Sequence, residues 1–176
     1  MAASVLHWLE TREHRLMRRV NRWTPPRWMR LWMLAATRGG DGWLWSALGV
    51  LVALAGGPER FRATLAAVLA VSAGILLFLA LKRACNRKRP CALEPHCWAT
   101  LLPPDQFSFP SGHTITAFAV AIALGEFYPA LLPALLLCAL LIATSRILLG
   151  MHFLSDVVVG ALLGAGLALT SHSLFI

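Results

Sequence analysis

Five stretches of the sequence, each of about 17 to 20 residues, contain no Asp, Glu, Lys or Arg. They cover residues 42–58, 63–81, 106–125, 127–145 and 157–176. Each is about long enough to cross a hydrocarbon core of roughly 30 Å as an α-helix. A backbone in lipid must be helical or close into a barrel, and these stretches lack the alternating pattern of barrel strands. The sequence therefore predicts an all-α integral membrane bundle of about five transmembrane helices.

Composition agrees with one small membrane domain. The chain of 176 residues is 58% hydrophobic and 14% charged, with a mean hydropathy of +0.67, which is too apolar for an ordinary soluble domain. We expect a basic amphipathic segment over residues 1–40 and a membrane-embedded domain over residues 41–176. The first segment has no apolar core followed by a small-residue cleavage site, so we expect no cleavable signal peptide.

The N-terminal segment combines arginines with apolar and aromatic residues. This pattern is typical of a helix that lies in the membrane interface and is anchored there by aromatic rings. A basic targeting flank with no further role is an equal alternative. The residues that carry the pattern are Leu6, Leu9, Leu16 and Val20, Arg12, Arg15, Arg18, Arg19 and Arg22, and Trp23, Trp28 and Trp32.

The formal charge of +8 raises the question of a partner. Because the basic residues cluster beside apolar stretches, membrane lipids are the expected partner, and nucleic acid is not. Cys91 and Cys97 form a disulfide if their loop is extracytoplasmic, and the sequence leaves this open. His96 beside them suggests a metal site only weakly, so we expect no metal. The oligomeric state is also left open.

Since successive spans alternate in direction, the unusual polar residues fall on one membrane face. In the first of three segments, Lys82 and Arg89 stand seven residues apart, about two helical turns. If the helix continues to Pro90, both side chains point the same way and can grip two oxygens of one phosphate. The alternative is a basic flank that follows the positive-inside rule.

The second segment places small and polar residues where the third span begins. Backbone N–H groups at a helix start bind anions, and Ser111 adds a hydroxyl donor. Gly112 lets an oxygen approach the main chain, and His113 can give a proton to a leaving oxygen. A lone histidine at a membrane edge is usually structural, so the case for function depends on this composition around it.

The third segment contains Arg146, His152 and Asp156. If the fifth helix starts near His152, Asp156 lies one turn further on the same face and can hydrogen-bond the imidazole. That bond fixes the tautomer and leaves the other ring nitrogen as an in-line nucleophile. Arg146 can neutralise charge on the phosphoryl group. Together the three segments supply what phosphate-ester hydrolysis requires, with no metal or cofactor.

The same residues resemble the three-part signature of the type 2 phosphatidic acid phosphatase and vanadium haloperoxidase superfamily. Lysine, six residues and Arg-Pro stand at 82–90, Pro-Ser-Gly-His at 110–113, and Ser-Arg, five residues, His, three residues and Asp at 145–156. The resemblance covers roughly residues 43–172 and implies a helical core. It also implies His152 as nucleophile, Asp156 as its orienter and His113 as general acid, with phosphate held by Lys82, Arg89, Ser111, Gly112 and Arg146.

The membrane character of the chain favours the lipid phosphatase branch over the soluble haloperoxidases. Undecaprenyl diphosphate is the first substrate expected, and phosphatidylglycerol phosphate or phosphatidic acid the second. We expect a bacterial inner-membrane protein. The positive-inside rule favours a cytoplasmic site, whereas resemblance to bacterial polyprenyl diphosphate phosphatases favours an outward one, so the side stays open. A non-catalytic protein that binds anionic lipid is the alternative of another class, and a transporter is a remote one.

Overall fold

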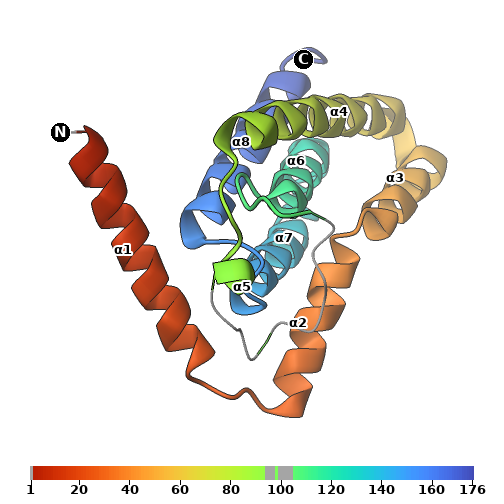
Figure 1. Cartoon of the computed structure of the whole chain (residues 1–176). Coiled ribbons are helices and arrows are strands. Elements are labelled where there is room, and N and C mark those ends of the chain that lie inside the picture. Colours follow the sequence, from red (N-terminus) through yellow and green to blue (C-terminus); the bar gives the residue numbers. More distant parts are fainter. Residues whose placement is uncertain (1, 94–97, 99–104) are drawn as a thin grey trace.

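The computed structural model describes residues 2–93, 98 and 105–176, with side chains from residue 11 onward. Every regular element in this part of the chain is a helix, so the prediction of an all-α protein is confirmed. In chain order the elements are α1 (Ala2–Asn21), α2 (Arg27–Gly39), α3 (Trp43–Ala55), the 3-10 turn η1 (Gly57–Glu59), α4 (Arg60–Cys85), α5 (Pro90–Leu93), α6 (Gly112–Phe127), α7 (Leu132–Leu148) and α8 (Leu154–His172) (Figure 1).

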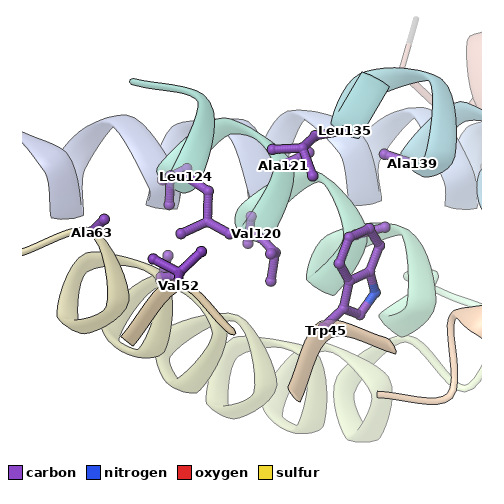
Figure 2. Packing of buried hydrophobic residues seen from close by; sticks show 14 of the residues in the cluster. Trp45, Val52, Ala63, Val120, Ala121, Leu124, Leu135 and Ala139 are labelled. Atoms are coloured by element: carbon purple, nitrogen blue, oxygen red, sulfur yellow. The ribbon is translucent and has the colours of Figure 1, made fainter. Parts of the chain in front are cut away.

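Helix α6 is the centre of the bundle, because α4, α7 and α8 all pack against it (Figure 1). Four of its nine buried residues are alanines and one is a glycine, so the neighbouring helices can approach its backbone closely. Figure 2 shows the core that results, with Val120, Ala121 and Leu124 of α6 facing residues of α3, α4 and α7. This packing fixes where the first turn of α6 lies.

The closest approach is between α6 and α8. A Cβ atom built on Gly164 of α8 would lie 2.4 Å from the carbonyl oxygen of Ile115 and 3.0 Å from the backbone nitrogen of Ala119. A Cβ on Gly166 of the same helix would meet nothing within 4 Å. The two glycines therefore differ in packing while sharing one helix.

This difference makes a matched test of the α6–α8 contact. We expect Gly164→Ala to destabilise the fold by about 1 to 3 kcal/mol, because backbone atoms cannot move aside as a side chain can. Gly166→Ala should be neutral or stabilising by up to about 1 kcal/mol, because alanine is the better helix former. Thermal unfolding in detergent measures both, and equal effects of the two substitutions would contradict the packing described.

The outer surface of the bundle is apolar. Leu54 of α3, Leu76 of α4 and Leu162 of α8 are 73%, 69% and 68% exposed, and many other large apolar side chains lie beside them. Within the described residues, Gly57–Cys85 and Leu154–His172 are long and apolar enough to cross a membrane. Helices α3, α6 and α7 are apolar but shorter, with 13, 16 and 17 residues. The count of five spans stays a prediction.

Helix α4 ends earlier than the sequence predicted, whereas the start of α6 agrees with the prediction. Helix α4 ends at Cys85, because Asn86 takes a left-handed conformation with φ of 47°. The expected continuation to Pro90 is therefore wrong, and Arg89 reaches its position from a non-helical segment. Helix α6 begins at Gly112, after Pro110, which agrees with the helix start that the sequence predicted at this segment.

The basic N-terminal segment forms two helices, α1 and α2, which meet at a corner (Figure 1). Helix α1 buries Glu13 and Met17, while Trp28 and Trp32 of α2 are exposed. Placement of this segment in the membrane interface stays a prediction. His96 and Cys97, on which the disulfide and metal questions depend, lie outside the described residues.

Candidate active site

One cavity of about 800 Å³ lies between α3, α4 and α6 and reaches the loops at one end of the bundle. Its polar end brings together six of the eight site residues predicted from the sequence. These are Lys82, Arg89, Gly112, His113, Arg146 and His152. The other two, Ser111 and Asp156, are fully buried and do not line the cavity. Residues from three separate segments thus share one wall.

His152 lies between α7 and α8 and is almost completely buried. Its Nδ1 is 2.6 Å from the backbone oxygen of Ser108, and its Nε2 is 3.2 Å from Nη1 of Arg89. A carbonyl oxygen only accepts and a guanidinium only donates. Nδ1 therefore carries the proton, and Nε2 presents its lone pair toward the cationic end of the cavity.

Burial also keeps this imidazole neutral. Burial lowers the pKa of His152 to about 4, and the charges of Arg146 and Arg89 act in the same direction, against an opposing contribution from Asp156. At neutral pH the ring is therefore unprotonated at one nitrogen, which is the form that can attack an electrophile.

Asp156 does not hold His152 in the way the sequence suggested. Its Oδ2 is 3.7 Å from Nδ1 of His152, which is beyond a good hydrogen bond. The expectation of a direct bond is wrong because α8 begins at Leu154, so His152 precedes the helix instead of lying one turn below Asp156. The same Oδ2 accepts the backbone N–H of Phe153 at 2.8 Å and so caps α8.

Arg87 connects Asp156 to the N-terminal helix. One guanidinium nitrogen donates to Oδ1 of Asp156 at 2.7 Å and to Oγ of Ser155 at 2.8 Å, while the other donates to Glu13 of α1 at 2.5 Å. The second oxygen of Glu13 accepts the backbone N–H of Ser155 at 2.6 Å. A carboxylate from α1 thus stabilises the start of α8, directly and through Arg87.

Lys82 and Arg89 converge on one carboxylate, that of Asp105. Lys82 pairs with one oxygen, and Arg89 donates to the other at 3.0 Å and to the backbone oxygen of Asp105 at 2.9 Å. Burial alone would raise the pKa of Asp105, but its hydrogen bonds and charge contacts with Lys82 and Arg89 outweigh this and hold the pKa below its ordinary value. The carboxylate marks a position where two cations can hold an anion.

A phosphate that binds Lys82 and Arg89 has to displace this carboxylate. We expect Asp105→Asn to tighten competitive inhibition by inorganic phosphate several-fold, up to about tenfold, because the neutral amide competes less well for the two cations. Glu59→Gln is the control, since Glu59 pairs with Arg62 at the other end of α4. Inhibition constants measured by titration check the prediction. Weaker inhibition in Asp105→Asn would mean that the carboxylate organises the cations instead.

Arg146 is the third cation of the site and is 4% exposed. Its Nη1 donates to Oγ1 of Thr37 at 2.6 Å, which fixes the guanidinium against α2. Its Nε is buried and has no hydrogen-bond partner among the described residues. A buried N–H of a charged group without a partner is costly, so this donor suits an oxygen of a bound anion.

The first turn of α6 forms the remaining wall. Ser111 occupies the N-cap position of α6. Its hydroxyl oxygen accepts a hydrogen bond from the hydroxyl of Thr114 at 2.9 Å, and its N–H donates to the backbone oxygen of Asp156 at 3.1 Å. Gly112 faces Phe78, and a Cβ at this position would lie 3.2 Å from that ring. His113 follows, with Nε2 at 2.8 Å from Oδ1 of Asp41. The start of α6 thus lies beside the cations, because Gly112 and His113 line the same cavity as Lys82, Arg89 and Arg146.

Several residues of the site carry no signal in the sequence. Asp41, Asp105 and Glu13 are single carboxylates in segments that the motif spacing does not cover. Thr37 and the carbonyl of Ser108 contribute only because the fold brings them close. The chain has 8 acidic residues, and four of them, Glu13, Asp41, Asp105 and Asp156, pair with cations or a histidine at this end of the bundle.

The fold and the site together define a class: an all-helical protein in which a buried histidine faces a cationic pocket. Residues 63–175 match the PAP2 superfamily, and the chain belongs to this family of phosphatases. The decaprenylphosphoryl-5-phosphoribose phosphatase of Mycobacterium tuberculosis is 38% identical over 140 residues, which cover 76% of this chain and 75% of the relative.

Solved structures have the same fold. The crystal structure of Aquifex aeolicus LpxE superimposes with a TM-score of 0.78 at 30% identity and covers 90% of this chain and 93% of its own. That of a transmembrane PAP2-type phosphatidylglycerolphosphate phosphatase from Bacillus subtilis gives a TM-score of 0.76 at 24% identity, with coverage of 98% and 89%. The chain is thus a lipid phosphatase of the PAP2 type, and the alternative of a non-catalytic lipid-binding protein is set aside.

Proposed function

We propose that this protein is an integral membrane phosphatase that removes a phosphate from a polyprenyl-linked lipid through a phosphohistidine on His152. The observation that carries the proposal is the position of Nε2 of His152. This lone pair lies beside Arg89 in the polar end of a cavity whose other end is apolar. One cavity thus contains the nucleophile, the anion site and a hydrophobic channel.

In the first step Nε2 of His152 attacks the phosphorus atom, and an N–P bond forms as the bond between phosphorus and the leaving oxygen breaks. Lys82, Arg89 and Arg146 stabilise the charge on the phosphoryl oxygens. His113 gives its proton to the leaving oxygen. The Ser108 carbonyl, which accepts a hydrogen bond from Nδ1–H, orients the ring and stabilises the positive phosphohistidine.

In the second step a water molecule attacks the phosphohistidine. Its oxygen forms a new bond to phosphorus, the N–P bond breaks, and its proton passes to His113, which now acts as a base. Phosphate leaves with its charge still facing the three cations. Asp105 then returns to Lys82 and Arg89 and restores the arrangement described above.

The apolar part of the cavity supports a lipid substrate. From the catalytic end it continues between α3 and α4, where Gly49, Val50 and Ala53 of α3 face Val71 and Ile75 of α4. Only the headgroup end of this channel is charged, so an apolar chain can occupy it while the phosphate reaches His152. The exposed leucines on the outside of α3 and α4 support placement of this channel in a bilayer.

For the substrate we favour a polyprenyl carrier. Undecaprenyl diphosphate is the first candidate, and the 38% identity to a phosphatase of decaprenylphosphoryl-5-phosphoribose supports a polyprenyl tail. Phosphatidylglycerol phosphate and phosphatidic acid are the second candidates, because the cations recognise phosphate and not the tail. We place the protein in a bacterial inner membrane and assign no side to its active site.

Phosphate release tests the proposal directly. The protein in detergent is incubated with undecaprenyl diphosphate, phosphatidylglycerol phosphate and phosphatidic acid in the presence of EDTA. We expect release by the wild type and a loss of about 10³-fold or more in His152→Ala, because the nucleophile is removed. Correctly folded protein that releases phosphate from none of these lipids, or a His152→Ala variant with full activity, would refute the proposal.

A substitution in the apolar part of the cavity tests whether this channel holds the lipid tail. Gly49 lines the channel, and a Cβ there would meet no atom within 4 Å, so Gly49→Phe should project its ring into the channel. We expect KM for a long-chain lipid phosphate to rise about tenfold, with little change for 4-nitrophenyl phosphate, which has no tail. Ala47→Phe on the exposed face of α3 is the matched control. An equal loss on both substrates in Gly49→Phe would argue that the substitution distorts the site.

A further inference from the structure

The turn between α2 and α3 contacts the catalytic end of the cavity, although it lies outside the three motif segments and outside residues 63–175 that match the family. Thr37 accepts a hydrogen bond from Arg146, and Asp41 accepts one from His113. Two residues of the site are thus fixed by one short segment of the N-terminal part of the chain. Of these contacts, the one between Asp41 and His113 has a chemical consequence.

This turn has a defined geometry. Gly42 adopts a φ of +100°, which a residue with a side chain rarely takes, and redirects the chain into α3. The indole N–H of Trp43 donates to the backbone oxygen of Arg38 at 2.7 Å and closes the turn. A Cβ on Gly40 would lie 2.8 Å from Cδ2 of His113 and 2.9 Å from Cγ2 of Ile142, so only glycine lets the turn approach the imidazole this closely.

The contact itself is a direct hydrogen bond. Nε2 of His113 lies 2.8 Å from Oδ1 of Asp41, and the carboxylate is 50% exposed while the imidazole is 24% exposed. His152 and Asp156, by contrast, are 3.7 Å apart. Among the described residues that line the cavity, the histidine with a carboxylate at hydrogen-bond distance is therefore His113.

We propose that Asp41 is the positioning residue of His113: it holds the Nε2 proton, so that the other ring nitrogen exchanges the proton of the reaction, and it stabilises the positive ring. The inference rests on the proposed function, in which His113 protonates the leaving oxygen and later accepts a proton from water. A carboxylate on one nitrogen of an imidazole fixes its tautomer and orientation and stabilises the imidazolium. Asp41 acts through His113 and does not touch the reacting atoms.

A leaving-group comparison tests this role. An alkyl oxygen leaves poorly without a proton, whereas 4-nitrophenolate leaves well without one. In Asp41→Asn the amide oxygen can still accept the Nε2 proton, so the charge is lost and the hydrogen bond is kept. We expect kcat for a lipid alkyl phosphate to fall roughly 10- to 100-fold and kcat for 4-nitrophenyl phosphate to change less than about threefold. Glu59→Gln, distant from the cavity, is the matched control and should change neither value.

A double-mutant cycle shows whether the effect passes through His113. In a His113→Ala background, adding Asp41→Asn should have no further effect on the lipid alkyl phosphate, because the residue that Asp41 positions is already absent. Multiplicative losses in the double variant would overturn the inference, as would an equal loss on both substrates in Asp41→Asn or no loss on either.

Failure of the proposed function has a different signature. It would appear as absent phosphate release in the wild type, or as full activity in His152→Ala, before any variant of Asp41 is measured. If the wild type is active and His152→Ala is inactive, the two comparisons above decide the role of Asp41 alone. Thermal unfolding of Asp41→Asn should match that of the wild type within a few degrees, which separates loss of chemistry from loss of folding.

Discussion

The site depends on the point where α6 and α8 begin side by side. A Cβ on Gly160 would lie 2.9 Å from the backbone oxygen of Ser111, and the N–H of Ser111 donates to the backbone oxygen of Asp156 at 3.1 Å. These contacts join the start of one helix to the start of the other. Because both helices continue as a closely packed pair, His113 is held on the first turn of α6, and His152 is held two residues before the start of α8.

Concentrating cations at this junction creates an electrostatic problem that carboxylates resolve. Arg87, Arg89 and Arg146 are wholly or partly buried within a small volume, and like charges in a medium of low dielectric repel strongly. Asp105 and Asp156 each accept from one or more of these cations. The two differ in exposure: Asp156 is fully buried and caps a helix, whereas Asp105 is 32% exposed and lines the cavity. Asp105 is therefore open to exchange with another anion, whereas Asp156 is closed to it.

Much of the site could be predicted from sequence, and the reason is geometric. Lys82, His113, Arg146 and His152 stand at fixed distances from helix ends, and the alternation of apolar stretches places those ends on one side. The predictions that were wrong concerned the residue at which a helix begins or ends. Asn86 takes a left-handed conformation and ends α4 early, so Arg89 is not on the helical face assumed for it. The start of α8 two residues after His152 likewise moved Asp156 out of hydrogen-bond range.

The role of the N-terminal helices was the hardest part of the structure to predict from the sequence. An arginine-rich amphipathic segment has the same composition whether it serves as a membrane anchor or as a structural support.

The contacts favour a structural role for these helices at the site. Glu13, Thr37 and Asp41 come from the first 41 residues, and each reaches a residue of the motif segments or its immediate neighbour. Glu13 is 8% exposed, although a carboxylate on a helix used only as an anchor would gain nothing from burial. The motif residues line the polar end of the cavity, and the segment before them supplies carboxylates and a hydroxyl that hold motif side chains in place. A catalytic unit that began at residue 63 would therefore lack the partners of His113 and Arg146.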